Sequence, residues 1–247
     1  MRRALTVFIL LMLTGCVSTG TKIDKTKMAE GYYTKGLSYL QEKNYELASV
    51  EFNRSIQTDS NYKQSYYGLG IICDYQGKLD DAVKYYKEAI DRDSNYSEAH
   101  NALGVVYTKQ KKYDEAIKSF NKALENKLYT TPHIPYLNLG DLYMSRKEYD
   151  KAAEAYRDSK RYFNHELTIY RLGMALYEGG KYKDSIKEFQ EGVTLSPRNT
   201  SMRFSLAVAL LKDGNKKSAL SEFKKVVELD PKSDIALKAN DYIKTLR

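Results

Sequence analysis

The chain has 247 residues, with 40 lysine and arginine against 32 aspartate and glutamate side chains, and a formal net charge of +8 at pH 7. This length is enough for one or two ordinary domains. The basic excess is mild and spread along the chain, which suits acidic partners or anionic lipid heads. No basic stripe is interleaved with aromatic residues, which argues against a nucleic-acid-binding protein.

The N-terminus combines two arginines, Arg2 and Arg3, with an apolar run over residues 4–13. This run is too short to span a bilayer as a permanent helix. A basic start, a short apolar core and small residues after it are typical of a secretory signal peptide. The sequence LTGC at residues 13–16 resembles a bacterial lipoprotein box, in which the cysteine is lipidated and becomes the mature N-terminus. Ordinary cleavage near Gly15, or an apolar leader with a chance cysteine, is the alternative.

We therefore expect residues 1–15 to be a lipoprotein signal peptide and Cys16 to be the lipid (palmitate) attachment site. A triacylated cysteine would be a lasting anchor, because each buried methylene group adds about 0.8 kcal/mol and a single chain is marginal. Val17 follows the cysteine, where an aspartate would favour inner-membrane retention in enterobacterial-type lipoproteins. We expect an outer-membrane protein that faces the periplasm, with residues 16–28 as a lipidated N-terminus and short polar tether.

A repeat of about 34 residues fills most of the remaining chain. Its marker is a small residue at position 8 of each copy, and the intervals are 34, 34, 36, 33 and 34 residues. The six marker residues are Gly36, Gly70, Gly104, Gly140, Gly173 and Ala207. A fixed period in this range is the signature of a stacked helical array.

Each copy predicts two helices. Positions 4, 7, 8 and 11 lie on one face of a first helix, and positions 20, 24 and 27 lie on one face of a second. Small residues at positions 8 and 20 allow the two helices to approach closely, and aromatics at positions 4, 11 and 24 fill the gaps. Glycines at QGK (76–78) and GGK (179–181) end the first helix. Pro197 and Pro231 come where the second helix must stop.

These residues resemble the tetratricopeptide repeat over residues 29–233. The resemblance implies an all-α, right-handed superhelical solenoid of six helix-turn-helix repeats. The first copy lacks the position-7 leucine and the sixth has Arg203 at position 4, as end repeats often deviate. Residues 234–247 predict a C-terminal capping helix, in which Ile235, Ala239, Tyr242 and Leu246 cover the last repeat and Lys238 faces water.

Such arrays bind partners in a concave groove lined by positions 2, 5, 9 and 12 of the first helices. These positions are polar in repeat three and mostly apolar in repeats four to six. We predict a partner-binding groove formed by Tyr33, Leu37, Tyr67, Ile71, Leu137, Leu167, Tyr170, Met174, Tyr177, Phe204, Val208 and Leu211. Solvent-facing apolar residues in such number mark an interaction surface for a helix or strand of another protein. Superhelical curvature or the capping helix burying some of them is the alternative.

The third interval is irregular, because extra residues and two prolines, Pro132 and Pro135, separate repeats three and four. Pro135 can occupy the first turn of the next helix. The string ALENKLYTTP (123–132), followed by YLNLG (136–140), is similar to a local signature of the type IV pilus biogenesis pilotin (PilF/PilW) family. Lys127 departs from it, since proline is common there in the family.

The pilotin resemblance implies a lipoprotein scaffold that binds a pilus secretin. It would aid the localisation and multimerisation of the secretin in the outer membrane during type IV pilus biogenesis. The alternative is a general periplasmic adaptor lipoprotein of the same fold that recruits a protease or a cell-wall enzyme.

We find no residues that indicate an enzyme, a cofactor, a small-molecule substrate or a metal. His100, His133 and His165 lie in different repeats without a carboxylate or cysteine at ligand spacing. No phosphate-binding loop or nucleophile elbow is present. Cys73 is at position 11 of repeat two and predicts a small buried thiol.

Overall fold

The computed structural model describes residues 19–246, with side chains from residue 25 onward. This part of the chain folds into helices alone, which confirms the all-α fold class. The helices are α1 (Thr19–Gln41), α2 (Tyr45–Thr58), α3 (Lys63–Tyr75), α4 (Leu79–Arg92), α5 (Ser97–Lys109), α6 (Tyr113–Glu125), α7 (His133–Ser145), α8 (Tyr149–Tyr162), α9 (Glu166–Glu178), α10 (Tyr182–Leu195), α11 (Thr200–Lys212), α12 (Lys216–Leu229) and α13 (Asp234–Leu246).

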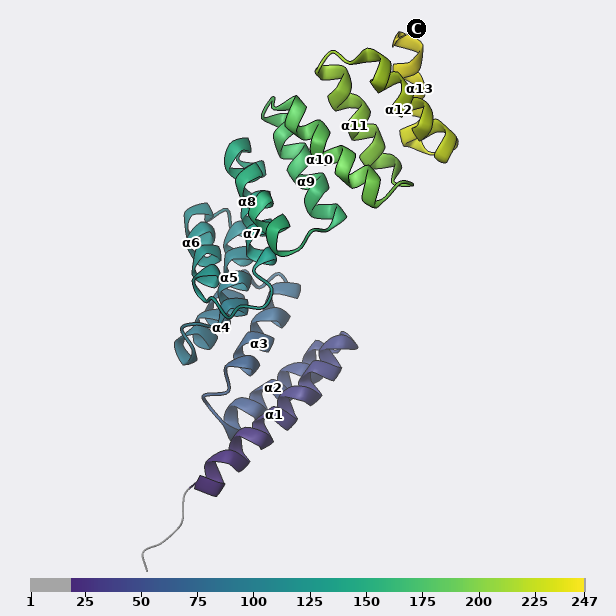
Figure 1. The fold of residues 1–247 in the computed structure, drawn as a ribbon. Coiled ribbons are helices and arrows are strands. Elements are labelled where there is room, and N and C mark those ends of the chain that lie inside the picture. The colour runs from purple at the N-terminus through teal and green to yellow at the C-terminus, as the bar shows by residue number, and fades with distance from the viewer. Residues whose placement is uncertain (1–18, 247) are drawn as a thin grey trace, which may run out of the picture.

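Consecutive helices pair as hairpins, from α1 with α2 to α11 with α12, and each hairpin packs mainly on its neighbours along the chain. Figure 1 shows the hairpins stacked in chain order as an elongated, curved array, with α1 at one end and α13 at the other. Six helix-turn-helix repeats and a capping helix therefore form a solenoid, as the period of the sequence predicted.

In five of the six repeats, a glycine at position 8 lies at the close contact between the two helices. The aromatic rings at position 24 fill this contact, and those of Phe52, Tyr86, Phe120, Tyr156, Phe189 and Phe223 are almost fully buried. A methyl group added at Gly140 would lie 2.3 Å from the ring of Tyr156, and one at Gly104 would lie 2.6 Å from Phe120. No side chain fits at these glycines unless the opposing ring moves.

The turn inside each repeat has the same left-handed residue whether or not that residue is glycine. Gly77, Gly180 and Gly214 have φ values of 73°, 74° and 85°. In the other three repeats Lys43, Lys111 and Lys147 occupy this position, with φ values of 60°, 60° and 59°. Glycine adopts this conformation without a steric cost, and lysine does not.

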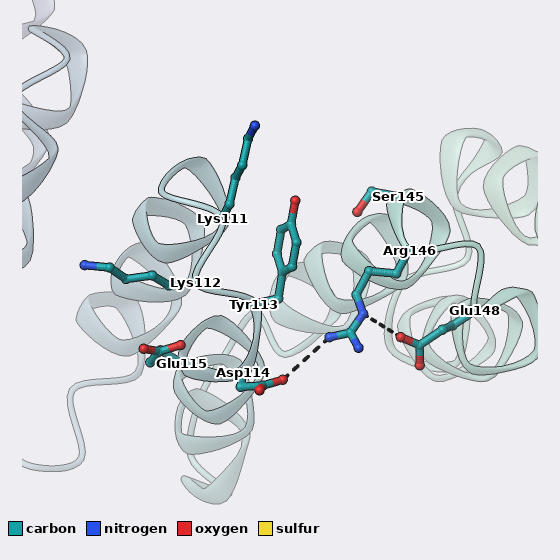
Figure 2. Close-up of a pocket in the computed structure, with 8 residues that line it drawn as sticks. All are labelled: Lys111, Lys112, Tyr113, Asp114, Glu115, Ser145, Arg146 and Glu148. Carbon is teal, nitrogen blue, oxygen red and sulfur yellow. Dashed lines mark ion pairs between the residues drawn. The ribbon is translucent and has the colours of Figure 1, made fainter.

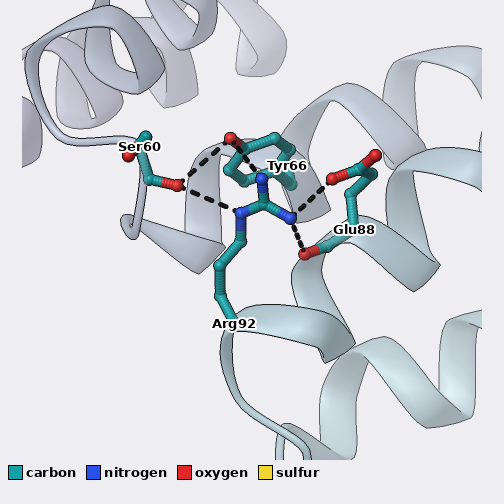
Figure 3. Close-up of polar contacts among 4 residues, drawn as sticks. All are labelled: Ser60, Tyr66, Glu88 and Arg92. Atoms are coloured by element: carbon teal, nitrogen blue, oxygen red, sulfur yellow. Dashed lines mark hydrogen bonds and ion pairs between the residues drawn. The ribbon is translucent and has the colours of Figure 1, made fainter.

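Polar side chains join neighbouring repeats at the opposite edge of the array. Figure 3 shows Arg92, at the end of α4, reaching into the turn before α3. Its Nε donates to the carbonyl oxygen of Ser60 at 3.0 Å, and one Nη donates to the hydroxyl of Tyr66 at 2.9 Å. The guanidinium also lies 3.8 Å from the centre of the Tyr66 ring, so it makes a cation–π contact.

The structure adds detail to the sequence-based predictions at the start of α1 and at the junction between α6 and α7. The helix α1 begins at Thr19, so the described part of the expected tether, residues 19–28, is helical. Between α6 and α7 the chain leaves helical structure, with Leu128 88% exposed and Tyr129 buried. Pro135 is buried in the first turn of α7, as expected.

Candidate partner-binding groove

The predicted groove residues lie on the first helices of their repeats. The structure places Tyr33 and Leu37 on α1, Tyr67 and Ile71 on α3, Leu137 on α7, Leu167, Tyr170, Met174 and Tyr177 on α9, and Phe204, Val208 and Leu211 on α11. Leu37 and Leu167 are exposed, at 38% and 45%, and the other ten are half-buried.

Tyrosine rings dominate the N-terminal stretch of this face. The ring of Tyr33 lies 5.6 Å from that of Tyr62, and the ring of Tyr67 lies 5.4 Å from that of Tyr96. Burial raises the pKa of Tyr67 to about 12, so its hydroxyl stays protonated at neutral pH. This stretch therefore consists of packed neutral rings rather than an open apolar trough.

Polar contacts between successive first helices occupy the middle of the array. Each joins a side chain of one repeat to the same face of the next: Lys109 to Asp74, Asn138 to Asn101 and Arg171 to Asp141. The Asp141 carboxylate also accepts a hydrogen bond of 2.6 Å from the hydroxyl of Tyr156. These contacts fix the spacing of α3, α5, α7 and α9, and they leave few free polar groups for a partner.

An apolar pocket lies at the C-terminal end of the face. It has a volume of about 320 Å³ and is lined by Tyr170, Met174 and Tyr177 of α9, Phe189 of α10, Ser201, Phe204, Ser205 and Val208 of α11, and Ile235 and Lys238 of α13. Five of the twelve predicted groove residues thus come together in one cavity.

The walls of this pocket also belong to the core. The ring of Phe204 lies 5.5 Å from that of Phe223 and 5.9 Å from that of Tyr242, and Met174, Val208 and their neighbours pack on the same buried cluster. These residues therefore both pack on the core and line the pocket. Leu137 and Leu211 pack against core clusters and do not line the pocket.

The wall formed by α13 was not predicted from the sequence. Ile235 was expected to cover the last repeat, and Lys238 to face water. Lys238 is exposed, yet it and Ile235 both line the pocket. Their three-residue spacing, which puts them on one helical face, is the signal in the sequence that indicates a shared wall.

A second, larger depression lies at the turns of repeats three and four and has a different character (Figure 2). It has a volume of about 650 Å³ and polar walls. Arg146 points into it, 3.6 Å from the carboxylate of Asp114 and 2.5 Å from that of Glu148. Because two carboxylates already neutralise this guanidinium, the depression is an ion-pair cluster rather than a binding site.

The remaining predictions from the sequence concern the cysteines and the histidines. Cys16 lies outside the described residues. His100 is buried, and its Nε2 lies 2.9 Å from the carbonyl oxygen of Ser94, to which it donates. Within residues 25–246 no histidine, cysteine and carboxylate side chains cluster as a metal site would require. Cys73 is half-buried rather than fully buried, and burial raises the pKa of its thiol.

A membrane-spanning helix is also not found among the described residues, since none of their helices is both long and apolar enough.

Sequence models of the tetratricopeptide repeat match nearly the whole helical array. One matches residues 67–127 and 170–234, and a second matches residues 29–62 and 135–162. A human protein O-mannosyl-transferase, TMTC1 of Homo sapiens, is 31% identical over 75 residues. That match covers 30% of this chain and only 8% of the length of the transferase.

Several solved structures share the fold. The pilF protein of Pseudomonas aeruginosa has a TM-score of 0.72 at 20% identity, covering 88% of this chain and 99% of that one. PilW, described as a widely conserved type IV pilus biogenesis factor, has a TM-score of 0.66 at 17% identity, with 91% and 100% covered. YrrB, described as having an unusual peptide-binding site, has a TM-score of 0.64 at 20% identity, with 77% and 97% covered.

Proposed function

The chain belongs to the tetratricopeptide repeat family, and we propose that it is a lipid-anchored scaffold of the outer membrane. It faces the periplasm, binds a pilus secretin, and aids the localisation and multimerisation of that secretin in type IV pilus biogenesis. Repeats of this family generally bind other proteins, and binding without turnover is the mechanism here.

The apolar pocket between α9, α11 and α13 is the observation that carries this proposal. Met174, Phe204 and Val208 line it and are half-buried, so part of each side chain is accessible to an incoming group. Surfaces of this kind take an apolar anchor from a partner helix or strand. The fold-level likeness to pilF and to PilW, a type IV pilus biogenesis factor, is consistent with a role in this process, and the pilotin-like junction of the sequence implies a secretin as the partner.

Blocking the pocket tests the proposal without removing a core contact. Ser201 is exposed and lines the pocket, so Ser201→Trp places an indole at its mouth. Ser221→Trp is the matched control, since Ser221 is exposed on α12 and does not line the pocket. We expect Ser201→Trp to reduce secretin multimers in the outer-membrane fraction and crosslinking to the secretin, with Ser221→Trp unchanged. Normal multimers with Ser201→Trp at equal protein level would refute docking at this site.

The anchor is tested separately with Cys16→Ser. We expect the variant to lose acyl labelling and to leave the membrane fraction. Unchanged fractionation with no acyl label on the native chain would rule out the lipid anchor. A crosslinked pull-down from native membranes that enriches a protease or a cell-wall enzyme and no secretin would instead indicate the general adaptor.

A further inference from the structure

The apolar pocket is lined by one charged residue. The charge of this residue limits which kind of partner segment the pocket can bind. This inference rests on the proposed function, because it concerns the same groove. Of the ten lining residues, seven are apolar or aromatic, two are serines, and the charged one is Lys238. A partner segment must therefore match an apolar floor and a cationic wall.

The Lys238 ammonium has no internal partner among the described residues, nor do the hydroxyls of Ser201 and Ser205. Other cations of the array behave differently: Lys160 on α8, for example, is held 2.7 Å from both Glu188 and Glu191. On α13 itself, Asp241 pairs with Lys244 at 3.4 Å, and Asp234 makes no ion pair with Lys238. The positive charge of Lys238 is consequently available to a ligand.

The size of the pocket limits what the apolar part can be. A volume of about 320 Å³ is near the lower end of small-ligand sites, which run to roughly 1,000 Å³. It suits one or two large side chains, not a whole helix. Met174 is unbranched and polarisable, so it can adapt to aliphatic or aromatic groups.

We propose that the pocket binds a protein segment in which a large apolar side chain stands next to a carboxylate. The apolar side chain inserts between Met174 and Phe204, and the carboxylate forms a charge-assisted contact with Lys238. The serine hydroxyls are donors for the same carboxylate or for the backbone beside it. Repulsion from Lys238 disfavours a basic segment. A purely apolar segment makes no contact with the Lys238 ammonium.

The carboxylate has two sources, a chain terminus or an aspartate or glutamate side chain. Three labelled peptides distinguish these two sources of the carboxylate. All three have the same Gly-Ser spacer and a Leu-Phe anchor. One has a free C-terminus, one is amidated, and one is amidated with an aspartate preceding the anchor. Binding to the full chain in detergent is measured by fluorescence polarisation.

We expect at least one acidic peptide to bind about tenfold more tightly than the neutral amide, the size of one charge-assisted contact. Tight binding of the free acid alone indicates a chain terminus, and tight binding of the aspartate peptide alone indicates an internal acid. Lys238→Glu should remove the preference. Lys217→Glu, the same charge change at an exposed position of α12 outside the pocket, should keep it. Lys238 is exposed, so its substitution leaves the fold intact.

Equal binding of all three peptides, or an acid preference that survives in Lys238→Glu, would overturn the inference. If the peptides bind equally and Ser201→Trp blocks them, the pocket remains a docking site and only the acid preference is wrong. If no peptide binds, or if Ser201→Trp blocks none of them, docking at the pocket fails, and the acid preference fails with it.

Discussion

In three of the repeats, three different residues at position 4 make the same hydrogen bond. The hydroxyl of Tyr66 donates to the carbonyl oxygen of Ser60 at 3.1 Å. In repeat six a guanidinium nitrogen of Arg203 donates at 2.8 Å to Pro197, which also lies six residues earlier. His100 makes the equivalent contact in repeat three. Arg203, expected to be an end-repeat deviation, therefore preserves the contact that ties the inter-repeat turn to the first helix.

The glycine at position 8 gives a direct test of close helix packing. In Gly140→Ala the new methyl group would meet the ring of Tyr156, whose hydroxyl is tied to Asp141 and cannot move freely. We expect the free energy of unfolding to fall by about 1–3 kcal/mol, as in other overpacked cores. Equilibrium denaturation in urea measures it.

Gly31→Ala is the matched control, because Gly31 lies in α1 with no atom within 4 Å of an added methyl group. The same change there should stabilise the protein by up to about 1 kcal/mol through helix propensity. If both substitutions changed the free energy of unfolding equally, helix propensity and not close packing would determine the effect of replacing Gly140.

The ion pair between Arg203 and Glu222 predicts a pH dependence. Burial alone would raise the pKa of Glu222, but hydrogen bonds from Lys225 and Arg203 outweigh it and hold the pKa below its usual value. A carboxyl group with a lowered pKa stabilises the fold above its unfolded-state pKa, about 4.3, and this stabilisation is lost as the pH falls through the folded-state value.

We therefore expect Glu222→Gln to lower the free energy of unfolding at pH 7 by roughly 1–3 kcal/mol, because a buried cation loses its partner. As the pH falls from about 5 to about 2, the free energy of unfolding should also decrease less for the variant than for the native chain. Urea denaturation at several pH values measures both effects. Glu228→Gln, an exposed change on the same helix, should show neither; a parallel pH profile for Glu222→Gln and the native chain would contradict this account.

At the scale of the elements, several helix starts and turns are defined by local sequence. Asn44, Asn199 and Asn215 each cap a helix by accepting a backbone N–H bond with the side chain, as their positions before apolar periodic segments suggest. The left-handed turn was predictable at Gly77 and Gly180. At Lys43, Lys111 and Lys147 it was not, since packing of the two helices imposes it against the preference of lysine.

The groove was only partly predictable for a related reason. Position within a repeat tells which face Tyr170, Met174 and Phe204 occupy, because helical periodicity is a local property. It does not tell how far α13 reaches over that face. The contribution of Lys238 to the pocket depends on the docking of α13, in which Tyr242 stacks on Phe223 with ring centres 4.7 Å apart and Ile243 packs in the last core cluster. The extension of α1 to Thr19 was missed because that segment has no apolar periodicity.

The docking of α13 can be tested with one buried and one exposed side chain. Ile243 is 7% exposed and packs in the last core cluster, whereas Leu237 on the same helix is 57% exposed. We expect Ile243→Ala to cost about 2–4 kcal/mol, through lost burial and a residual cavity. Leu237→Ala should change the free energy of unfolding by less than about 0.5 kcal/mol. Thermal denaturation measures both, and similar losses for the two would show that α13 docks by a different face.

At the scale of the whole molecule, stability is the sum of contacts between neighbours. The helices α6 and α7 pack less extensively than other successive pairs, and the irregular segment from Asn126 to Pro132 separates them. An array of this kind unfolds in blocks where an interface is weak. We therefore expect the irregular junction at residues 126–132 to divide the array into two blocks that unfold separately.

We expect hydrogen exchange in mild denaturant to show two blocks, with the boundary between residues 126 and 132. Amides of α1–α6 and of α7–α13 should lose protection at different denaturant concentrations. The variant Leu172→Ala truncates a fully buried side chain of α9 whose core cluster is formed by α8 and α9, so it should lower the protection of the second block far more than that of the first. Simultaneous loss of protection over the whole chain would show a single cooperative unit.

The opposite placement of α1 and the pocket sets how far the protein can search. Figure 1 shows α1 and α13 at the two extremes of the array. With an acyl chain at residue 16, the extra helical residues 19–28 add a stiff segment of about 15 Å, at 1.5 Å per residue, before the first repeat. The C-terminal end of the array, which contains the pocket, can then move over the widest range that the length of the molecule allows. Such a geometry raises the local concentration of the pocket for targets well above the lipid surface, and it disfavours those that lie flat upon it.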